Sequence, residues 1–253
     1  MAGAGTAAPA SQTLSRGIRI LELLADVREP LAIDEVALRL GVHRSIAYRL
    51  LRTLEDHGLV NRDSSGRVVL GARMAALAAG VAHDLQAEAL PELTAIANEL
   101  GMTCFLAVLD RDECITLASV EPRHAIASVA QRPGARHSIL VGAPSKAILS
   151  ALPEAEWPSA AGSQLRAEIA AAARDGYATS HDEVIPTVQA VSVPLRLRSE
   201  HRPAAIAVVH VGRGEDPAAV AERLHRSAAS IREALGGQPI SAVRPPADRR
   251  RAR

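Results

Sequence analysis

Along the first 60 residues, apolar side chains recur every three or four positions, as they do on one face of an amphipathic helix. Three segments have this spacing, namely 14–25, 33–40 and 44–57. Pro30 interrupts the chain after the first segment, Gly41 opens a tight turn after the second, and Gly58 ends the third. The pattern predicts three consecutive helices, with a tight turn between the second and the third.

The next residues change to a short extended pattern. Leu59–Arg62 and Arg67–Leu70 lie on either side of the turn sequence Asp63–Gly66, which predicts a β-hairpin. Residues 72–100 return to helical spacing. Pro91 should kink or divide this helix, because proline lacks the amide proton that a helix interior uses.

Beyond Gly101 short β-rich runs alternate with charged turns, which predicts antiparallel strands joined by hairpins. The expected strands are 103–109, 114–120, 125–130, 190–197 and 204–211. The expected helices are 145–151, 164–174 and 217–235. The predicted fold class is therefore α/β of the α+β kind, with a helical N-terminal unit and an antiparallel sheet flanked by helices.

Composition excludes several classes of protein. With 48% hydrophobic and 23% charged residues the chain is typical of a globular protein, and no apolar run reaches the roughly 20 residues that a bilayer requires. The N-terminus lacks the basic and apolar regions of a secretory signal. Cys104 and Cys114 lie in apolar runs, as buried thiols do in a reducing compartment. We expect a cytoplasmic protein without membrane contact.

Three helices followed by a hairpin are the elements of a winged helix-turn-helix, whose third helix enters the major groove of DNA. The net charge of +1 gives no overall attraction to nucleic acid, so the prediction depends on local charge. Between Glu35 and Glu55 the chain has no acidic residue, and the arginines there are unopposed in sequence. The expected DNA-contacting residues are His43, Arg44, Ser45, Tyr48, Arg49 and Arg52 on the helix, with Arg62 and Arg67 on the wing.

An arginine-lined helix face is weaker evidence for DNA binding in this chain than in most. Lys146 is the only lysine, so arginine supplies nearly all of the basic residues wherever they occur, and such a face is often merely solvated. The order of the elements favours DNA binding, because the turn glycine, the buried spacing and the hairpin occur together.

Three segments resemble the IclR (isocitrate lyase regulator) family of transcriptional regulators: LSRGIRILELLAD, RLLRTLEDHGLVNRDSSGRVVLGARM and RDGYATSHDEV. The resemblance implies a GAF-like effector-binding domain and a homodimer or tetramer on an inverted-repeat operator. It further implies a regulator, more often a repressor, of transport or catabolic genes that responds to a small molecule. The implied organisation is a DNA-binding domain at 14–71, a linker helix at 72–84 and an effector domain at 85–236. From their composition and lack of periodicity, residues 1–13 and 237–253 are expected to be disordered tails.

The chain departs from the family pattern at two places. His43 and Ile46 stand where the family commonly has proline and threonine, at the start of the recognition helix. The family's Gly-Lys-Ala occurs here as Ser145-Lys146-Ala147, directly after Pro144, which stiffens a loop that usually contributes backbone groups to the pocket.

The resemblance also implies an effector pocket between the sheet and the segment around residue 144. Its expected residues are Val129, His137, Ala143, Pro144, Ser145, Ala190, Ser192, Ala207 and Val209. Family members that bind short oxo-acids often have hydroxyl or thiol groups at three of these positions, where this chain has Ala190, Ala207 and Val209. We therefore expect a less polar effector, such as an apolar or aromatic acid, with its carboxylate compensated by amides near Ser145 or by His137.

Other interpretations remain open from the sequence. Alanine and valine on strands are more often core than pocket, which would leave a DNA-binding dimer that senses no effector. An enzyme with an accessory DNA-binding domain is the other alternative. No catalytic motif, metal-ligand spacing or cofactor-binding motif occurs in the sequence, so we expect neither a catalytic site nor a metal or cofactor.

Overall fold

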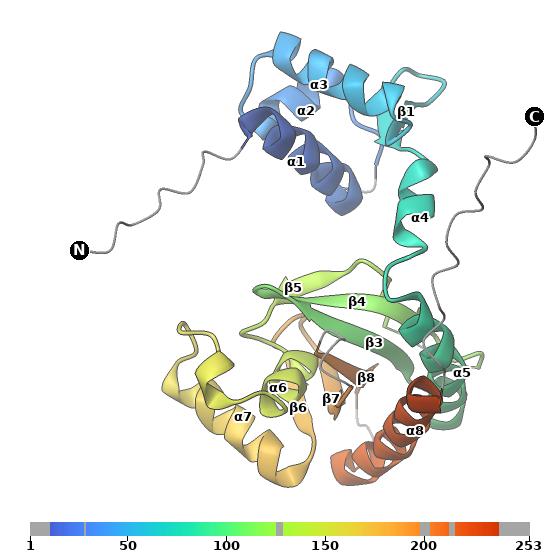
Figure 1. The fold of residues 1–253 in the computed structure, drawn as a ribbon, viewed down its shortest axis with the longest axis vertical. Helices are drawn as coiled ribbons and strands as arrows, with labels where there is room; N and C mark the ends of the chain where they lie inside the picture. Colours follow the sequence, from blue (N-terminus) through green and yellow to red (C-terminus); the bar gives the residue numbers. More distant parts are fainter. Residues whose placement is uncertain (1–10, 28, 125–128, 198–202, 213–215, 238–253) are drawn as a thin grey trace, which may run out of the picture. The chain divides into compact units, whose positions relative to one another are not determined.

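The computed structural model describes residues 11–27, 29–124, 129–197, 203–212 and 216–237. The chain divides into two compact units, Met1–Val81 and Ala82–Arg253. Figure 1 labels their elements, and each unit is considered by itself below. No helix within the described ranges has both the length and the apolar content needed to cross a bilayer.

The first unit is three helices followed by a two-stranded hairpin. Its elements are α1 (Gln12–Val27), α2 (Ile33–Leu40), α3 (Arg44–Asp56), β1 (Val60–Arg62), β2 (Val68–Leu70) and the short α4 (Arg73–Ala78). Ile20, Leu51 and Val68 are almost fully buried in the core between the helices and the hairpin. Leu31 pairs with Val68, so the stretch between α1 and α2 is hydrogen-bonded to the hairpin.

The helical region after the hairpin does not break where the sequence suggested. Pro91 lies inside α5 (His83–Leu100), and the interruption instead separates Ala78 from His83. Ala82 there has a positive φ of 48°, which ends any continuous helix. The carbonyl that loses its helical partner is that of Ala87, an exposed residue.

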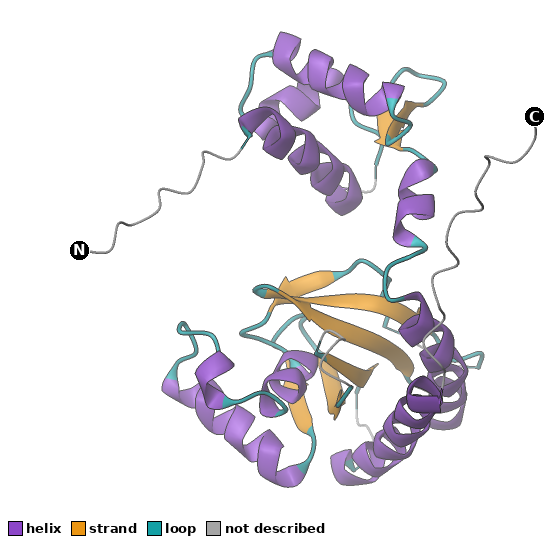
Figure 2. Cartoon of the chain, in the orientation of Figure 1, coloured by secondary structure: helices purple, strands orange, loops and turns teal. Residues whose placement is uncertain are grey.

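The second unit contains a six-stranded antiparallel sheet with helices on both faces (Figure 2). The strands are β3 (Thr103–Asp110), β4 (Glu113–Val120), β5 (Arg136–Ser138), β6 (Ala178–His181), β7 (Val188–Leu195) and β8 (Ala204–Val211), in the order β5-β4-β3-β8-β7-β6. The helices after α5 are α6 (Ala143–Ser150), the 3-10 turn Glu154–Glu156, α7 (Ser163–Asp175) and α8 (Pro217–Gly237). The sequence missed β5 and β6, and of the strand expected at 125–130 only residues 129 and 130 are described, without strand structure.

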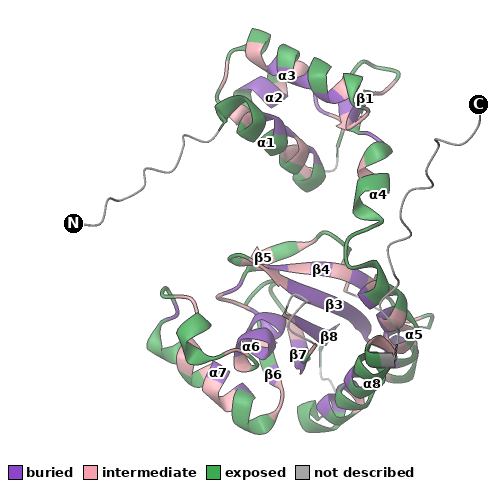
Figure 3. Cartoon of the chain, viewed as in Figure 1, coloured by how far each residue is buried: buried purple, intermediate pink, exposed green. Residues whose placement is uncertain are grey.

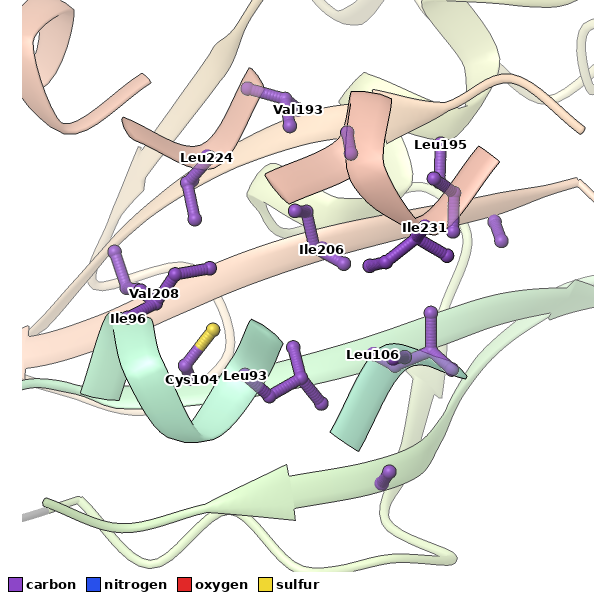
Figure 4. Close-up of a cluster of buried hydrophobic side chains, with 14 of the residues drawn as sticks. Leu93, Ile96, Cys104, Leu106, Val193, Leu195, Ile206, Val208, Leu224 and Ile231 are labelled. Carbon is purple, nitrogen blue, oxygen red and sulfur yellow. The ribbon is translucent and has the colours of Figure 1, made fainter. Parts of the chain in front are cut away.

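Alternating residues of the strands supply two separate cores. On one face Leu106, Val193 and Ile206 pack against α5 and α8, as Figure 4 shows. On the other face Phe105, Ala107 and their neighbours pack against α6 and α7. Because β3 and β8 at the centre of the sheet are buried on both faces, they have long apolar runs (Figure 3).

Candidate DNA interface and effector cavity

Helix α3 buries one face and exposes the other. Ala47, Leu50, Leu51 and Leu54 are buried against the rest of the unit, at the spacing of a single helical face. Gly41 ends α2 with a left-handed φ of 66°, a conformation that glycine adopts without strain, and this turn leads the chain into α3. The exposed face of α3 includes Ser45, Tyr48, Arg49 and Arg52, four of the residues predicted to contact DNA.

His43 caps the start of α3. Its Nδ1 accepts a hydrogen bond from the amide of Ser45 at 3.3 Å and lies 2.9 Å from the Ser45 hydroxyl. Because Nδ1 accepts from the amide, the ring presents Nε2–H to solvent at the end of the helix that meets base edges in helix-turn-helix proteins. His43 therefore has a structural role as the cap of α3.

The arginines of α3 differ in their surroundings. Arg44 was expected to be unopposed, but its Nε lies 3.2 Å from the carboxylate of Asp34 on α2, an acidic residue just outside the acid-free stretch. This pair is weak, because both side chains are 66% exposed. Within the described residues no ion pair involves Arg49 or Arg52, and both side chains are exposed. These two guanidinium groups are the ones most available to DNA.

The two wing arginines are held by acidic residues of the same unit. Arg62 Nε lies 3.3 Å from Glu55 at the end of α3, and Arg67 pairs with Glu35 at 2.7 Å and donates to the Pro30 carbonyl at 2.8 Å. These contacts fix the hairpin against the helices. The sequence could not show the contacts of Arg67, because Pro30 and Glu35 are more than 30 residues away along the chain.

The tip of the wing is a rigid turn around Asp63. Its carboxylate accepts hydrogen bonds from the Ser65 hydroxyl at 2.7 Å and from the amides of Ser65 and Arg67, both at 2.9 Å. The Ser65 hydroxyl and the Arg67 amide are the main causes that hold the pKa of Asp63 below its usual value.

In the second unit, a small cavity of about 40 Å³ lies between the sheet and the start of α6. Most of its lining is apolar, with Phe105 and Val209 from the strands and Val184 and Ile185 from the loop after β6. The polar groups are those of Gln131, His137 and Ser180. His137 Nδ1 lies 3.0 Å from the Ser138 carbonyl, which can only accept, so Nε2 is the nitrogen left for a ligand.

The structure brings together four of the nine predicted effector residues at this cavity: His137, Pro144, Ala190 and Val209. The remaining five do not line it: Val129, Ala143, Ser145, Ser192 and Ala207. Val129 packs against the core on this face of the sheet. The other four are fully buried, and the Ser192 hydroxyl donates to the Ile206 carbonyl at 3.0 Å inside the sheet.

Lys146, the one lysine, is buried beside this cavity between two carboxylates. Its Nζ lies 2.6 Å from Glu168 on α7 and 2.5 Å from Glu183, and Glu183 also accepts the Gly142 amide at 2.8 Å. Burial alone would lower the pKa of Lys146, but hydrogen bonds to the two glutamates outweigh it and raise that pKa. The hydrogen bond from Lys146 lowers the pKa of Glu168.

A larger groove of about 630 Å³ lies along β6 and was not foreseen from the sequence. Its lining is polar, with Glu168 and Asp175 from α7, Tyr177 just after that helix, and His210 from β8. Burial lowers the pKa of His210, and a backbone hydrogen bond with Val211 opposes that shift only in part.

The two cysteines are unreactive core residues. Both are buried as free thiols, and burial raises the pKa of Cys114 to about 12 and that of Cys104 further. In the part of the chain that the structure describes, no three His, Cys, Asp or Glu residues are grouped as metal ligands would be.

Both units match families of known proteins. Residues 13–64 match the IclR helix-turn-helix domain, and residues 78–233 match the C-terminal domain of bacterial IclR transcriptional regulators. The chain belongs to the IclR family. It is therefore a DNA-binding transcriptional regulator, with its DNA-binding elements in the first unit.

Individual relatives agree with this assignment. The chain is 26% identical to the HTH-type transcriptional regulator XynR of Escherichia coli over 250 residues, 90% of this chain and 98% of XynR. It is 30% identical to the transcriptional repressor IclR of E. coli over 118 residues, 45% and 43% of the two chains. An IclR homologue from Microbacterium hydrocarbonoxydans, solved in complex with 4-hydroxybenzoate, shares the fold with a TM-score of 0.76 at 24% identity, over 90% of this chain and all of that one.

Proposed function

We propose that this regulator is a repressor of transport or catabolic genes, released from an inverted-repeat operator by a small apolar or aromatic acid. The observation that carries the proposal is that one unit has a surface suited to DNA and the other has a cavity suited to a small molecule. The first unit exposes Arg49 and Arg52 on a winged helix-turn-helix, and the second encloses an apolar cavity with three polar groups. We place such a protein in the cytoplasm, where the bacterial genome is, and assign it no enzymatic activity.

Exposed apolar side chains in the first unit support a homodimer. Helix α4 has no buried residue (Figure 3). Its Leu77 is 60% exposed. On α1, Leu14 and Ile18 are 64% and 47% exposed. Exposed apolar side chains are costly in water, and a second copy of the same surface would cover them.

A symmetric dimer predicts a symmetric operator. Two identical α3 helices should contact two identical half-sites, so DNA fragments selected by the full-length protein should contain an inverted repeat. Selection from random duplexes followed by footprinting measures the site, and light scattering at micromolar concentration measures the assembly. A monomer that protects one asymmetric site would contradict both parts of the proposal.

The chemistry of the cavity predicts the class of effector. Ala190 and Val209 offer only methyl groups, so pyruvate and glyoxylate should leave the melting temperature unchanged, whereas aromatic monocarboxylic acids such as 4-hydroxybenzoate should raise it. That compound is bound by the Microbacterium homologue and is a reasonable first probe. A thermal-shift screen on the full-length protein makes the comparison, and stabilisation by pyruvate alone would reverse our assignment of the cavity's polarity.

Ala190→Leu is the matched variant for this screen. Ala190 lines the cavity and is 7% exposed, so a larger side chain there should remove the aromatic-acid shift while leaving operator affinity intact. Ala207 is unsuitable, because it is fully buried in the sheet and a larger residue would overpack the core. A shift that survives in Ala190→Leu would place the ligand elsewhere.

The sheet offers a route between the cavity and the DNA-binding unit. Phe105 on β3 lines the cavity, and its neighbours Cys104 and Leu106 face the opposite core, which includes α5. Helix α5 begins at His83, directly after the first unit ends at Val81. An effector that favours one arrangement of the sheet and α5 would thereby change the affinity of the paired DNA-binding units for the operator.

Two alternatives give different results in the same experiments. A dimer that senses no effector would bind an inverted repeat but show no shift with any acid. An enzyme with an accessory DNA-binding unit would convert a ligand that stabilises it, which is detected by analysing the ligand after incubation.

A further inference from the structure

Residues 182–187, the loop between β6 and β7, are fastened to the first turn of α6 by one side chain. Glu183 Oε2 accepts the amide of Gly142 at 2.8 Å, and Oε1 lies 2.5 Å from Lys146 Nζ. Both partners belong to the segment that begins α6. No other side chain of this loop makes a described hydrogen bond or ion pair to α6.

The fastened loop covers the effector cavity. Val184 and Ile185, the two residues after Glu183, line the cavity on one side and are 45% and 40% exposed. Val184 approaches α6 so closely that a Cβ on Gly142 would lie 3.0 Å from its Cγ2 and 3.1 Å from His137 Cε1. Gly142, with its φ of 86°, is the residue that allows the loop to close over the cavity.

The ends of the loop hold unfavourable backbone conformations. Asp182 and Thr187 have positive φ values of 60° and 67°, which are costly for residues other than glycine. The Thr187 amide donates to the Asp182 carboxylate, which closes the loop at its base. The loop is thus a compact segment with one side-chain attachment to α6 and strained ends.

The cavity as it stands is too small for the proposed effectors. Its volume is only about 40 Å³. A cavity that binds benzene in another protein has about 150 Å³. An aromatic acid can enter only if part of the lining moves. The loop is the candidate, because Glu183 supplies its one described side-chain attachment to α6 and its apolar residues Val184 and Ile185 are exposed.

We propose that Glu183 is the gate of the effector cavity: its bonds to Gly142 and Lys146 hold residues 182–187 closed, and these bonds break when the effector enters. This inference rests on the proposed effector cavity. The free protein is then mostly closed, and its apparent affinity for a ligand is reduced by the small fraction of open molecules. Weakening the gate should therefore tighten ligand binding, whereas removal of a ligand contact would weaken it.

Glu168→Gln is the matched control for Glu183→Gln. Glu168 gives Lys146 its other carboxylate at 2.6 Å, so both variants remove one negative charge from the same ammonium group. Glu168 lies on α7 and has no described contact with Gly142 or with residues 182–187. Only Glu183→Gln should release the loop.

Hydrogen exchange of the full-length protein tests the gate without any ligand. In Glu183→Gln the hydrogen-bonded amides of Asp182, Thr187 and Gly142 should exchange at least about tenfold faster than in the wild type, and in Glu168→Gln at the wild-type rate. Unchanged exchange in Glu183→Gln would overturn the proposal. Equal acceleration in both variants would do so as well, because it would indicate general loosening around Lys146.

Ligand affinity is measured with a fluorescent aromatic sulfonate, anilinonaphthalene sulfonate. Glu183→Gln should bind it at least about tenfold more tightly than the wild type and Glu168→Gln should not, while weaker binding by Glu183→Gln would make Glu183 a ligand contact. If Glu183→Gln folds poorly, Glu183→Asp takes its place. Aspartate keeps the negative charge but is too short to reach both Gly142 and Lys146, so the same tighter binding is expected. Operator binding is measured separately, so a wild type that fails to bind DNA refutes the proposed function and leaves the exchange result standing.

Discussion

Replacing Arg49 or Arg52 with alanine should weaken binding to a cognate operator by about 1–3 kcal/mol, roughly 5- to 150-fold, for each variant. The reason is that both guanidinium groups are exposed on α3 and have no ion pair in the described structure, so DNA would meet them unpaired. The measurement is fluorescence anisotropy with labelled operator DNA at fixed salt, because phosphate contacts depend steeply on ionic strength.

Arg19→Ala is the matched control for these variants. Arg19 is also an exposed arginine of the first unit, but it lies on α1 rather than on α3. Its loss changes the charge equally and should change specific affinity little. Wild-type affinity in both the Arg49 and the Arg52 variant would remove α3 from the recognition role.

The salt dependence of DNA affinity distinguishes an arginine that contacts a phosphate from one that reads a guanine edge. If Arg52 contacts a phosphate, its alanine variant should lose affinity for all sequences and reduce the slope of log K against log salt by about 1. If it reads a guanine edge, the loss should be confined to operators with that base pair. Because Arg49 and Arg52 are one helical turn apart, their effects need not add.

Much of the first unit could be predicted from periodicity, because its contacts are local. The helices at 33–40 and 44–57 match α2 and α3 to within a residue, since their ends depend on Gly41 and Gly58. The ion pairs of the wing could not be predicted in this way. Arg67 and Glu35 are 32 residues apart, and no local pattern marks them as partners.

The second unit shows where sequence patterns stop being informative. Strands β5 and β6 have three and four residues, too few for an alternating pattern to be recognised. Four of the residues assigned to the effector pocket lie at its lining, but alanines such as Ala207 are equally consistent with a core strand, and that is where Ala207 lies. The partners of Lys146 come from α7 and the loop after β6, which only the folded chain brings together.

Lys146→Met should destabilise the second unit by about 2–3 kcal/mol at neutral pH. Removing one partner of a fully buried ion pair costs roughly 3–5 kcal/mol, and the cost is smaller here because Glu168 and Glu183 are 37% and 28% exposed. The variant leaves two carboxylates that had shared one ammonium group, and their mutual repulsion has no compensation. Urea unfolding of both proteins gives the difference, provided that the m-values agree.

The stability lost in Lys146→Met should depend on pH, and the directions of the two pKa shifts determine how. The pKa of Glu168 is lowered in the folded protein, so its contribution is present above the unfolded pKa and disappears as the pH falls through the folded value. The pKa of Lys146 is raised, so its contribution is complete below the unfolded pKa and disappears as the pH rises through the folded value. The difference between wild type and Lys146→Met should therefore be widest between about pH 5 and pH 10 and shrink on both sides.

A neutral triple variant separates charge from packing in this cluster. Lys146→Met combined with Glu168→Gln and Glu183→Gln removes the ammonium and both carboxylates, and an uncharged replacement of a buried ion cluster is often neutral. The triple variant should recover most of the stability that Lys146→Met alone loses, and its unfolding free energy should vary less with pH. If the triple variant is as unstable as the single one, the cost arises from the shape of the methionine rather than from stranded charge. In that case the lysine is kept for its fit between α6 and α7, and Lys146→Arg, with its larger planar head group, should then be at least as damaging as Lys146→Met.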